Sequence, residues 1–359
     1  MEFFICIKKM HLQKMNTNHL STLLLIVTLT FASQKAHGQD FQFSQFYNVP
    51  LYQNPAFAGS LHQTRITAEQ RLQWPRLNAR YTTSLISADT YFAKFNMGIG
   101  GLIMQDYQGG SQISSTQAQF MYSYELKLSK QLTFRAGLQA GYVSSNVGYS
   151  ALRFPSQFDN QNGLISSSNS YGDTSAWKKV KSYGDFSSGG LLYSKRFWAG
   201  FAVHHMNTPN QSFAAGPGII STLPAEFAVT SGYQILLKKK VSMHHDKQEI
   251  TITPTFHYKQ QGRSNQLDLG VYGAANQFLV GIWYRGIPVI RYDNLPNNEA
   301  VIFFIGWKGD PLRIGYSYDF TISRLARAGT GGAHEINLTY VFPKRHRKRI
   351  MRTLPCPSF

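Results

Sequence analysis

Most of the chain after residue 64 alternates, one position at a time, between apolar and polar side chains. Residues 132–142 show the pattern most clearly, and the stretches 250–258, 312–320 and 336–342 repeat it. Side chains of a β-strand point alternately to opposite faces, so this period of two predicts strands with one apolar and one polar face. Many such strands in one chain predict an all-β protein whose apolar faces contact either a second sheet or lipid.

Composition favours lipid over a soluble β-sandwich. Aromatic residues make up 14% of the chain and charged residues only 15%, whereas soluble domains carry about 25% charged residues. No stretch of 18 or more apolar residues follows the N-terminus, which argues against membrane-spanning helices. Since only helices and closed sheets satisfy the backbone in lipid, we predict a transmembrane antiparallel β-barrel.

The number of alternating segments sets the size of the predicted barrel. Fourteen segments are long enough to span a membrane as tilted strands, and an even number suits a single-chain outer-membrane barrel. They are residues 65–74, 80–92, 97–107, 114–128, 130–144, 185–194, 196–206, 225–238, 248–260, 265–274, 277–286, 299–308, 311–322 and 334–342.

The links between these segments alternate in length, as expected for long external loops and short periplasmic turns. The long links are 145–184, 207–224, 287–298 and 323–333, and the short ones include 93–96, residue 195, 275–276 and 309–310. The link 239–247 is the exception, because it is long for a periplasmic turn.

The N-terminus has the pattern of a secretory signal. Basic residues, among them Lys8 and Lys14, precede the 13-residue apolar stretch 20–32, and Ala36-His37-Gly38 provides a small-x-small cleavage site. We therefore expect residues 1–38 to be a signal peptide, and an outer-membrane location for the mature chain. The alternative, an N-terminal membrane anchor, is disfavoured because 13 apolar residues are too few to span a bilayer as a helix.

Residues 39–64 lack the alternation. Pro50 and Pro55 disfavour helix and the interior of a sheet. The segment carries six aromatic residues that need burial: Phe41, Phe43, Phe46, Tyr47, Tyr52 and Phe57. We expect an extended, aromatic-rich segment inside the lumen or against the periplasmic mouth of a barrel formed by residues 65–342.

The C-terminal residues 343–359 are strongly basic. Six basic residues lie between 344 and 352, within a chain whose formal net charge is +18. A secreted protein rarely meets nucleic acid, so a periplasmic contact with an acidic partner or with phospholipid headgroups is the functional interpretation. A solvated tail is the alternative. Cys356 is the one cysteine after the signal, which excludes an internal disulfide.

Two stretches near the ends of the mature chain carry distinctive motifs. The first is 39–47 (QDFQFSQFY) with 50–59 (PLYQNPAFAG), and the second is 314–319 (IGYSYD) with 334–336 (HEI) and 356–359 (CPSF). Together with residues 203–207 (VHHMN), Pro209 and 281–285 (GIWYR), they resemble the PorP/SprF family of the type IX secretion system of Bacteroidetes. Phe41 departs from the family, which commonly has proline there.

The resemblance implies an outer-membrane barrel that works with the type IX translocon. It implies as partners the translocon barrel and associated periplasmic subunits, a large secreted or surface-attached client such as a gliding adhesin, and outer-membrane lipid, but no nucleic acid. The identity of the client is not implied.

No motif for catalysis, a cofactor or a metal is evident. His244, His245, Asp246 and Glu249 lie beside a run of lysines in a link, where a solvated turn is the simpler interpretation. Gly98–Gly101 lies on a predicted strand with no helix after it, which disfavours phosphate binding. We expect a protein that is not an enzyme.

Five charged or titratable side chains should point into the lumen: Arg135, His257, Lys259, Arg313 and Asp319. They either form a polar network that braces the barrel or bind the N-terminal segment or a passing client. His334 and Glu335 begin the last strand near the external rim, where they pair with a loop or close the sheet.

Three functions remain open from the sequence: a secretion-system partner protein, a diffusion channel for small solutes, and a structural tether. For the first we select partner-binding candidates at the two motifs, in the lumen and in the basic tail. They are Phe43, Ser44, Gln45, Tyr47, Asn54, Pro55, Phe57, Arg135, Arg313, Asp319, His334, Glu335, Lys344, Arg345, Arg347, Lys348 and Arg349.

Overall fold

The computed structural model describes residues 40–77, 80–110, 112–148, 158–159, 163–164, 180–213, 220–241, 247–292 and 295–343. The chain divides into two units, Met1–Gly38 and Gln39–Phe359. The expected signal peptide, the basic residues from 344 onward and the cluster His244–Asp246 lie outside the described residues.

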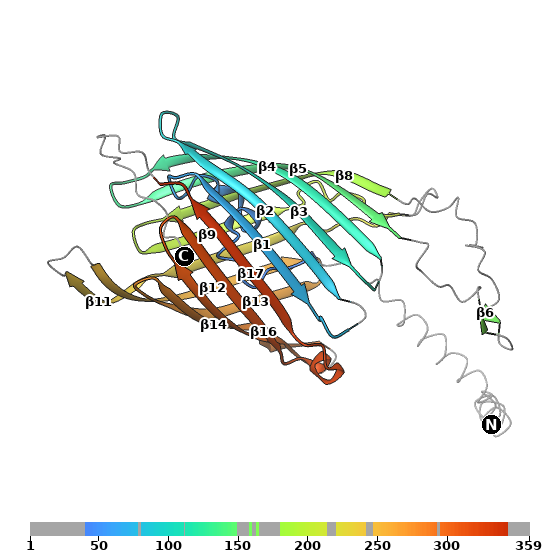
Figure 1. The fold of residues 1–359 in the computed structure, drawn as a ribbon. Helices are drawn as coiled ribbons and strands as arrows, with labels where there is room; N and C mark the ends of the chain where they lie inside the picture. The colour runs from blue at the N-terminus through green and yellow to red at the C-terminus, as the bar shows by residue number, and fades with distance from the viewer. Residues whose placement is uncertain are drawn as a thin grey trace, which may run out of the picture. The chain divides into compact units, whose positions relative to one another are not determined.

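The second unit contains a large sheet in which neighbouring strands pair antiparallel, nearly always with the next strand of that sheet along the chain (Figure 1). Its strands are β1 (Arg65–Gln73), β2 (Tyr81–Phe92), β3 (Met97–Gln108), β4 (Ile113–Lys127), β5 (Thr133–Val147), β8 (Val180–Tyr193), β9 (Phe197–His204), β10 (Glu226–Tyr233), β11 (Ile235–Val241), β12 (Lys247–Gln261), β13 (Ser264–Ala275), β14 (Phe278–Tyr292), β15 (Leu295–Lys308), β16 (Leu312–Thr321) and β17 (Ala333–Val341). A separate two-stranded sheet contains β6 (Phe158–Asp159) and β7 (Gly163–Leu164).

The sheet closes on itself. β1 pairs with β17 as well as with β2. β10 and β11 follow each other along the edge of β12, so together they fill one position in the wall. The result is the predicted closed barrel of fourteen strands, in which the predicted strand 225–238 is interrupted at Gln234.

The period-two pattern assigns the two faces of the wall correctly. On β5, Leu138 points outward with 63% of its surface exposed, while Arg135 points inward and is fully buried. The same alternation recurs on β12, β16 and β17. The outward face is therefore an apolar surface for lipid, as in membrane barrels.

The two ends of the barrel differ in their connections. The long links 148–179, 205–225 and 322–332 all lie at one end, called the loop end, beside shorter links such as 109–112 and 262–263. At the other end, called the turn end, links such as 93–96, 194–196 and 276–277 are short. The barrel's first and last strands begin and finish at the turn end.

One predicted long loop, 287–298, is wrong. β14 and β15 continue through most of it, with Ile287 opposite Asn297 and Tyr292 opposite Leu295. The register shifts at two places in this hairpin. Such bulges add residues to one strand and break the strict alternation on which the prediction rested. Likewise, pairing of β11 with β12 shortens the exceptional link 239–247 to residues 242–246.

Residues 40–64, called the plug below, lie inside the wall (Figure 1). The plug starts at the loop end, where the Asp40 amide donates to the Gln261 side chain at 3.1 Å. It finishes at the turn end, where the Gln63 amide group donates to the Phe342 carbonyl at 3.2 Å. It therefore runs through the whole barrel.

The plug is not uniformly extended, because it contains α3 (Pro50–Gln53) and η1 (Pro55–Phe57). Each proline stands in the first turn of its helix. There its missing N–H has no partner to lose and its fixed φ fits the helix, so proline excludes only the helix interior. The Asn54 side chain caps η1 by accepting from the Ala56 amide at 2.8 Å.

Candidate functional site

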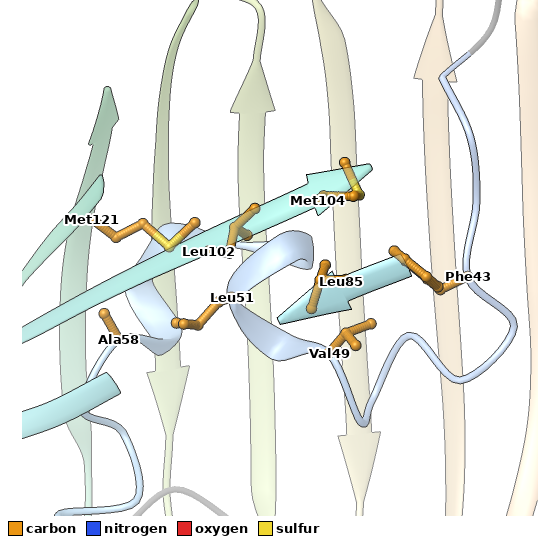
Figure 2. Close-up of a cluster of buried hydrophobic side chains, with 8 residues drawn as sticks. All are labelled: Phe43, Val49, Leu51, Ala58, Leu85, Leu102, Met104 and Met121. Atoms are coloured by element: carbon orange, nitrogen blue, oxygen red, sulfur yellow. The ribbon is translucent and has the colours of Figure 1, made fainter. Parts of the chain in front are cut away.

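The first contact between plug and wall is apolar, and it lies on β2, β3 and β4. Inward-pointing side chains there form a cluster with the plug, shown in Figure 2. The wall supplies Leu85, Leu102, Met104 and Met121, and the plug supplies Phe43, Val49, Leu51 and Ala58. These wall residues would face water in an open lumen. Burying each large one contributes about 1.5–3 kcal/mol, so this patch favours the occupied barrel.

A second patch is aromatic and lies on β12–β15. The Tyr47 ring stacks on Trp283 with centroids 4.8 Å apart, and the Phe46 ring stacks on His257 at 5.0 Å. The Trp283 indole N–H donates to the Thr255 hydroxyl at 3.1 Å, which fixes the orientation of the ring. A buried indole with its donor satisfied is a rigid surface for the plug.

A third patch, on β8 and β9, receives η1. Ala56 and Phe57 pack against Leu191, Tyr193 and Trp198. The backbone of η1 comes so close to β5 that only glycine fits: a Cβ at Gly137 would lie within 3 Å of the Ala56 nitrogen. The three patches lie on different sides of the wall, so the plug contacts the barrel around its interior.

Glu335 on β17 is the first polar anchor. Its carboxylate accepts the backbone amides of Ser44 at 2.8 Å and Gln45 at 2.6 Å. The Arg71 guanidinium on β1 donates to the same carboxylate at 2.9 Å. The Gln45 side chain donates to the Glu335 carbonyl and to the Ser317 hydroxyl. Charge-assisted bonds of this kind are the strong ones, particularly where water is excluded.

Asp319 on β16 extends this anchor to further strands. It accepts from the Ser44 hydroxyl at 2.5 Å and pairs with Arg71 at 3.0 Å and Arg285 at 3.3 Å. Arg285 on β14 also pairs with Asp268 on β13 at 3.0 Å. The two buried guanidiniums thus lie among four carboxylates, those of Asp268, Glu299, Asp319 and Glu335, which compensates the desolvation that isolated buried charges would suffer.

Arg135 on β5 is the second polar anchor. Its guanidinium donates to the backbone carbonyls of Ala56 and Ala58 and pairs with Glu125 at 2.7 Å. Glu125 stands directly opposite Arg135 in the β4–β5 register. The Ser123 hydroxyl, also on β4, donates to the Ala58 carbonyl at 2.7 Å. Carbonyl groups of the plug that lack a backbone partner are satisfied in this way.

Asn54 is the third anchor. Its side-chain amide donates to the carbonyls of Gly190 on β8 at 3.1 Å and Phe201 on β9 at 2.9 Å. A Cβ at Gly189 would lie within 3 Å of the Asn54 side chain. The two adjacent glycines, Gly189 and Gly190, therefore leave room for the Asn54 side chain to reach the backbone of the strand.

A latch of three ionisable groups holds the beginning of the plug at the loop end. His205 pairs with Asp40 at 2.6 Å and with Asp185 on β8 at 2.9 Å. Burial disfavours the imidazolium, but the two carboxylates outweigh it and raise the pKa of His205 to about 10. Burial also opposes ionisation of Asp40, yet the His205 charge and hydrogen bond lower its pKa to about 2.

Nine of the predicted residues meet at the plug–wall contact. They are Phe43, Ser44, Gln45, Tyr47, Asn54, Phe57, Arg135, Asp319 and Glu335. Pro55 opens η1 in the same place. Glu335 does not pair with a loop as one interpretation held; it binds the plug, because its inward position on β17 faces the amides of 44 and 45.

Other predicted positions lie apart from the anchors. Arg313 lines a cavity of about 50 Å³ at the turn end. The His334 Nδ1 atom and the Tyr316 hydroxyl are hydrogen-bonded at 2.8 Å. Lys259 lies 3.6 Å from Glu226 on the neighbouring strand rather than on the plug. Lys344, Arg345, Arg347, Lys348 and Arg349 lie outside the described residues.

Sequence reasoning missed several anchor residues. Four of them occupy inward positions on strands with alternating faces: Arg71, Glu125, Asp185 and Arg285. A charged residue on the polar face of a predicted strand was the signal that could have identified them. The inward Leu85, Met104 and Trp283 gave a different signal, since large apolar groups on a face meant for water indicate that something covers them.

The site contains acids and bases but nothing arranged as a metal centre. Within the described residues, no three or more His, Cys, Asp or Glu side chains are placed to hold an ion. None of the helices in that same part of the chain is long and apolar enough to cross a membrane. What the arrangement does chemically is hold one chain segment against another through buried contacts.

Comparison with solved structures finds other barrels. CymD, a monoaromatic hydrocarbon channel, shares 10% identity over 83% of this chain and 94% of its own, with a TM-score of 0.43. The Pseudomonas putida toluene transporter TodX shares 11% identity over 85% of this chain and 94% of its own, with a TM-score of 0.40. The KdgM porin shares 11% identity over 78% and 99%, with a TM-score of 0.35. Likeness this distant concerns the fold alone.

Sequence comparison is more specific. No curated protein sequence matches the chain. The model of one protein family, described as type IX secretion system membrane protein PorP/SprF, matches residues 35–340. The matched range includes the plug and all but the last residue of the barrel strands.

Proposed function

Since the chain belongs to the PorP/SprF family of type IX secretion system membrane proteins, we propose that it is a plugged outer-membrane barrel that links the translocon to a secreted client. In this proposal the barrel is not an enzyme and is not the path of export. It provides a fixed surface at which the translocon and a secreted or surface-attached protein, such as a gliding adhesin, meet.

The observation that supports this proposal is the occupied lumen. Three apolar patches and three polar anchors hold the plug against the wall. Because the plug is part of the same chain, its local concentration at the wall is high, and its release would expose apolar and charged groups together. A barrel filled in this way would bind its partners at its two ends and on its outer face, and not inside an open lumen.

The position of the long connections supports one orientation of the barrel. In outer-membrane barrels short turns face the periplasm and long loops face outward, with both termini of the barrel on the periplasmic side. The turn end would then face the periplasmic subunits of the secretion system, and the basic residues from Lys344 onward would follow the barrel on that side. The loop end would face the client.

Affinity purification at native expression level tests the link to the translocon. A tag placed in an external loop avoids both termini. We expect detergent extracts to yield the large translocon barrel and a secreted protein together with this chain. Recovery of the chain alone, under conditions that keep the translocon intact, would contradict the proposal.

Planar-bilayer recording tests the alternative of a diffusion channel. We expect purified protein to insert without stable conductance, because the plug fills the lumen of the described barrel and the cavity beside it that Arg313 lines holds only about 50 Å³, room for very few water molecules. Large and long-lived channels in the unmodified protein would favour the diffusion channel instead.

A further inference from the structure

A cavity of about 340 Å³ lies at the loop end, above the start of the plug. Residues 40–42 of the plug form part of its lining, and the rest comes from β1, β2, β3, β15, β16, β17 and the links beside them. The volume falls at the lower limit for cavities that bind small organic groups.

The cavity is lined by more acidic than basic side chains. Its four carboxylates are Asp40, Asp106, Glu299 and Asp319, and Arg71 is its basic residue. Asp40 is compensated by His205, and Asp319 by Arg71 and Arg285. Glu299 is half exposed and lies 3.9 Å from Arg285. The carboxylates that line the cavity therefore differ in how well basic side chains balance their negative charge.

Asp106 is the carboxylate without a basic partner. It is only 3% exposed, and it accepts hydrogen bonds from two neutral donors, the Thr83 hydroxyl at 2.6 Å and the Gln108 amide at 3.3 Å. Among the described residues no Lys, Arg or His nitrogen lies within 4 Å of it. A buried negative charge without a cation is unfavourable, so a cation entering the cavity would be stabilised there.

Asp319 provides an independent indication. The residue is 3% exposed and lines the same cavity, yet its Oδ1 has no hydrogen-bond partner among the described residues. A buried acceptor without a donor costs about 1–3 kcal/mol. A ligand that brings N–H donors into the cavity would relieve that cost.

The rim favours a cation on an apolar stem. Trp74 and Tyr81 line the cavity and meet edge to face, with ring centroids 5.3 Å apart. Phe41 adds a third ring from the plug. Aromatic faces attract ammonium and guanidinium groups and also pack against methylene chains.

We propose that this cavity binds the guanidinium or ammonium group of a basic side chain carried by the secreted client. The assignment rests on the proposed function for the source of the side chain, while its chemistry rests on the acceptors and rings described above. A guanidinium suits the site best because its donors are fixed in a planar fork that can reach several oxygens at once.

Calorimetric titration of the purified full chain in detergent tests this proposal. The probes are the blocked peptide Gly-Gly-Arg-Gly-Gly, the same peptide with glutamine in place of arginine, and free arginine. We expect the arginine peptide to bind at least about tenfold more tightly than the glutamine peptide, because only the former brings a cation to buried carboxylates. Free arginine should bind more weakly than the peptide, because it carries its own carboxylate.

Variants locate the binding. Asp106→Asn and Glu299→Gln should each weaken the arginine peptide by about tenfold or more. Asp310→Asn makes the same change of charge at the exposed turn end and should leave affinity unchanged. Heat-modifiable migration on gels verifies that each variant is folded, and Glu299→Gln tests the site even if the buried Asp106→Asn misfolds.

Equal affinity for the arginine and glutamine peptides, or unchanged affinity in both cavity variants, would overturn the proposal. Free arginine binding as tightly as the peptide would overturn the assignment to a client side chain. Recovery of the translocon is measured on the same variants. A chain that captures the translocon but does not distinguish the peptides refutes the cavity assignment and leaves the proposed function standing.

Discussion

Glu335 in the last strand accepts the backbone amide of Gln45 at 2.6 Å, across 290 positions of sequence. The contact joins the plug to the closing strand of the barrel. Glu335 is fully buried and also binds Arg71, so the plug amide and a wall charge depend on the same carboxylate.

Replacing that carboxylate should loosen the plug. Glu335→Ala leaves two plug amides without their acceptor and leaves Arg71 with Asp319 as its one carboxylate partner. Removing one partner of a buried charge pair costs about 3–5 kcal/mol. We expect a lower midpoint of thermal unfolding and transient conductance in planar bilayers. Asp310→Asn, at the exposed turn end, should behave like the unmodified protein. A silent and equally stable Glu335→Ala would show that the plug is held without this anchor.

Gly137 should tolerate no side chain. A Cβ there would lie within 3 Å of the Ala56 backbone, and overpacking of this kind typically costs about 1–3 kcal/mol. We expect Gly137→Ala to increase proteolysis within residues 50–64 while the barrel itself remains folded. Gly273→Ala is the matched control. A Cβ at Gly273 would lie 3.8 Å from the Thr251 carbonyl oxygen, the nearest atom outside its sequence neighbours. Equal protease resistance of the two variants would contradict a close contact at Gly137.

Leu138 should face lipid. A lysine at the lipid face costs about 2–4 kcal/mol near the middle of the bilayer, and Leu138 lies near the middle of β5 with most of its surface exposed. We expect Leu138→Lys to lower stability in lipid vesicles by an amount in that range, measured by reversible denaturant unfolding. Leu138→Met should have little effect. If the lysine variant is as stable as the methionine variant, the outward face is not in lipid.

The His205 latch should weaken at alkaline pH. Because the folded pKa of His205 is raised from 6.5 to about 10, its stabilising charge is fully present below pH 6.5 and is lost as pH rises toward 10. The pKa of Asp40 is lowered from 3.8 to about 2, so its contribution is present above pH 3.8 and is lost as pH falls toward 2. The latch is therefore strongest between about pH 4 and 6.5.

Thermal unfolding from pH 6 to 9.5 measures this dependence. The stability advantage of the unmodified protein over His205→Gln should shrink steadily across the range. His334→Gln, a half-buried histidine outside the latch, controls for the loss of an imidazole. An advantage over His205→Gln that stays constant with pH would mean that His205 is not the charged centre of the latch.

The amino-acid sequence by itself determined the wall. In a strand the direction of each side chain is fixed by its position, so the alternation was sufficient to place Leu138 outward and Arg135 inward. The same pattern also predicted how many strands the wall contains. The same rule failed at 287–298, where bulges interrupt the period. It also left the apolar Leu85 and Met104 on the inner face without an explanation.

Only the tertiary structure decided how the lumen is filled. The plug has no period, so nothing local in its residues states that Asn54 reaches β8 and β9, or that Gln45 reaches Glu335. Those contacts depend on the stagger of the strands around the closed barrel and on the path of a segment that crosses it. The alternating residues could be assigned to faces one by one, whereas the partners inside the barrel are set by closure of the whole sheet.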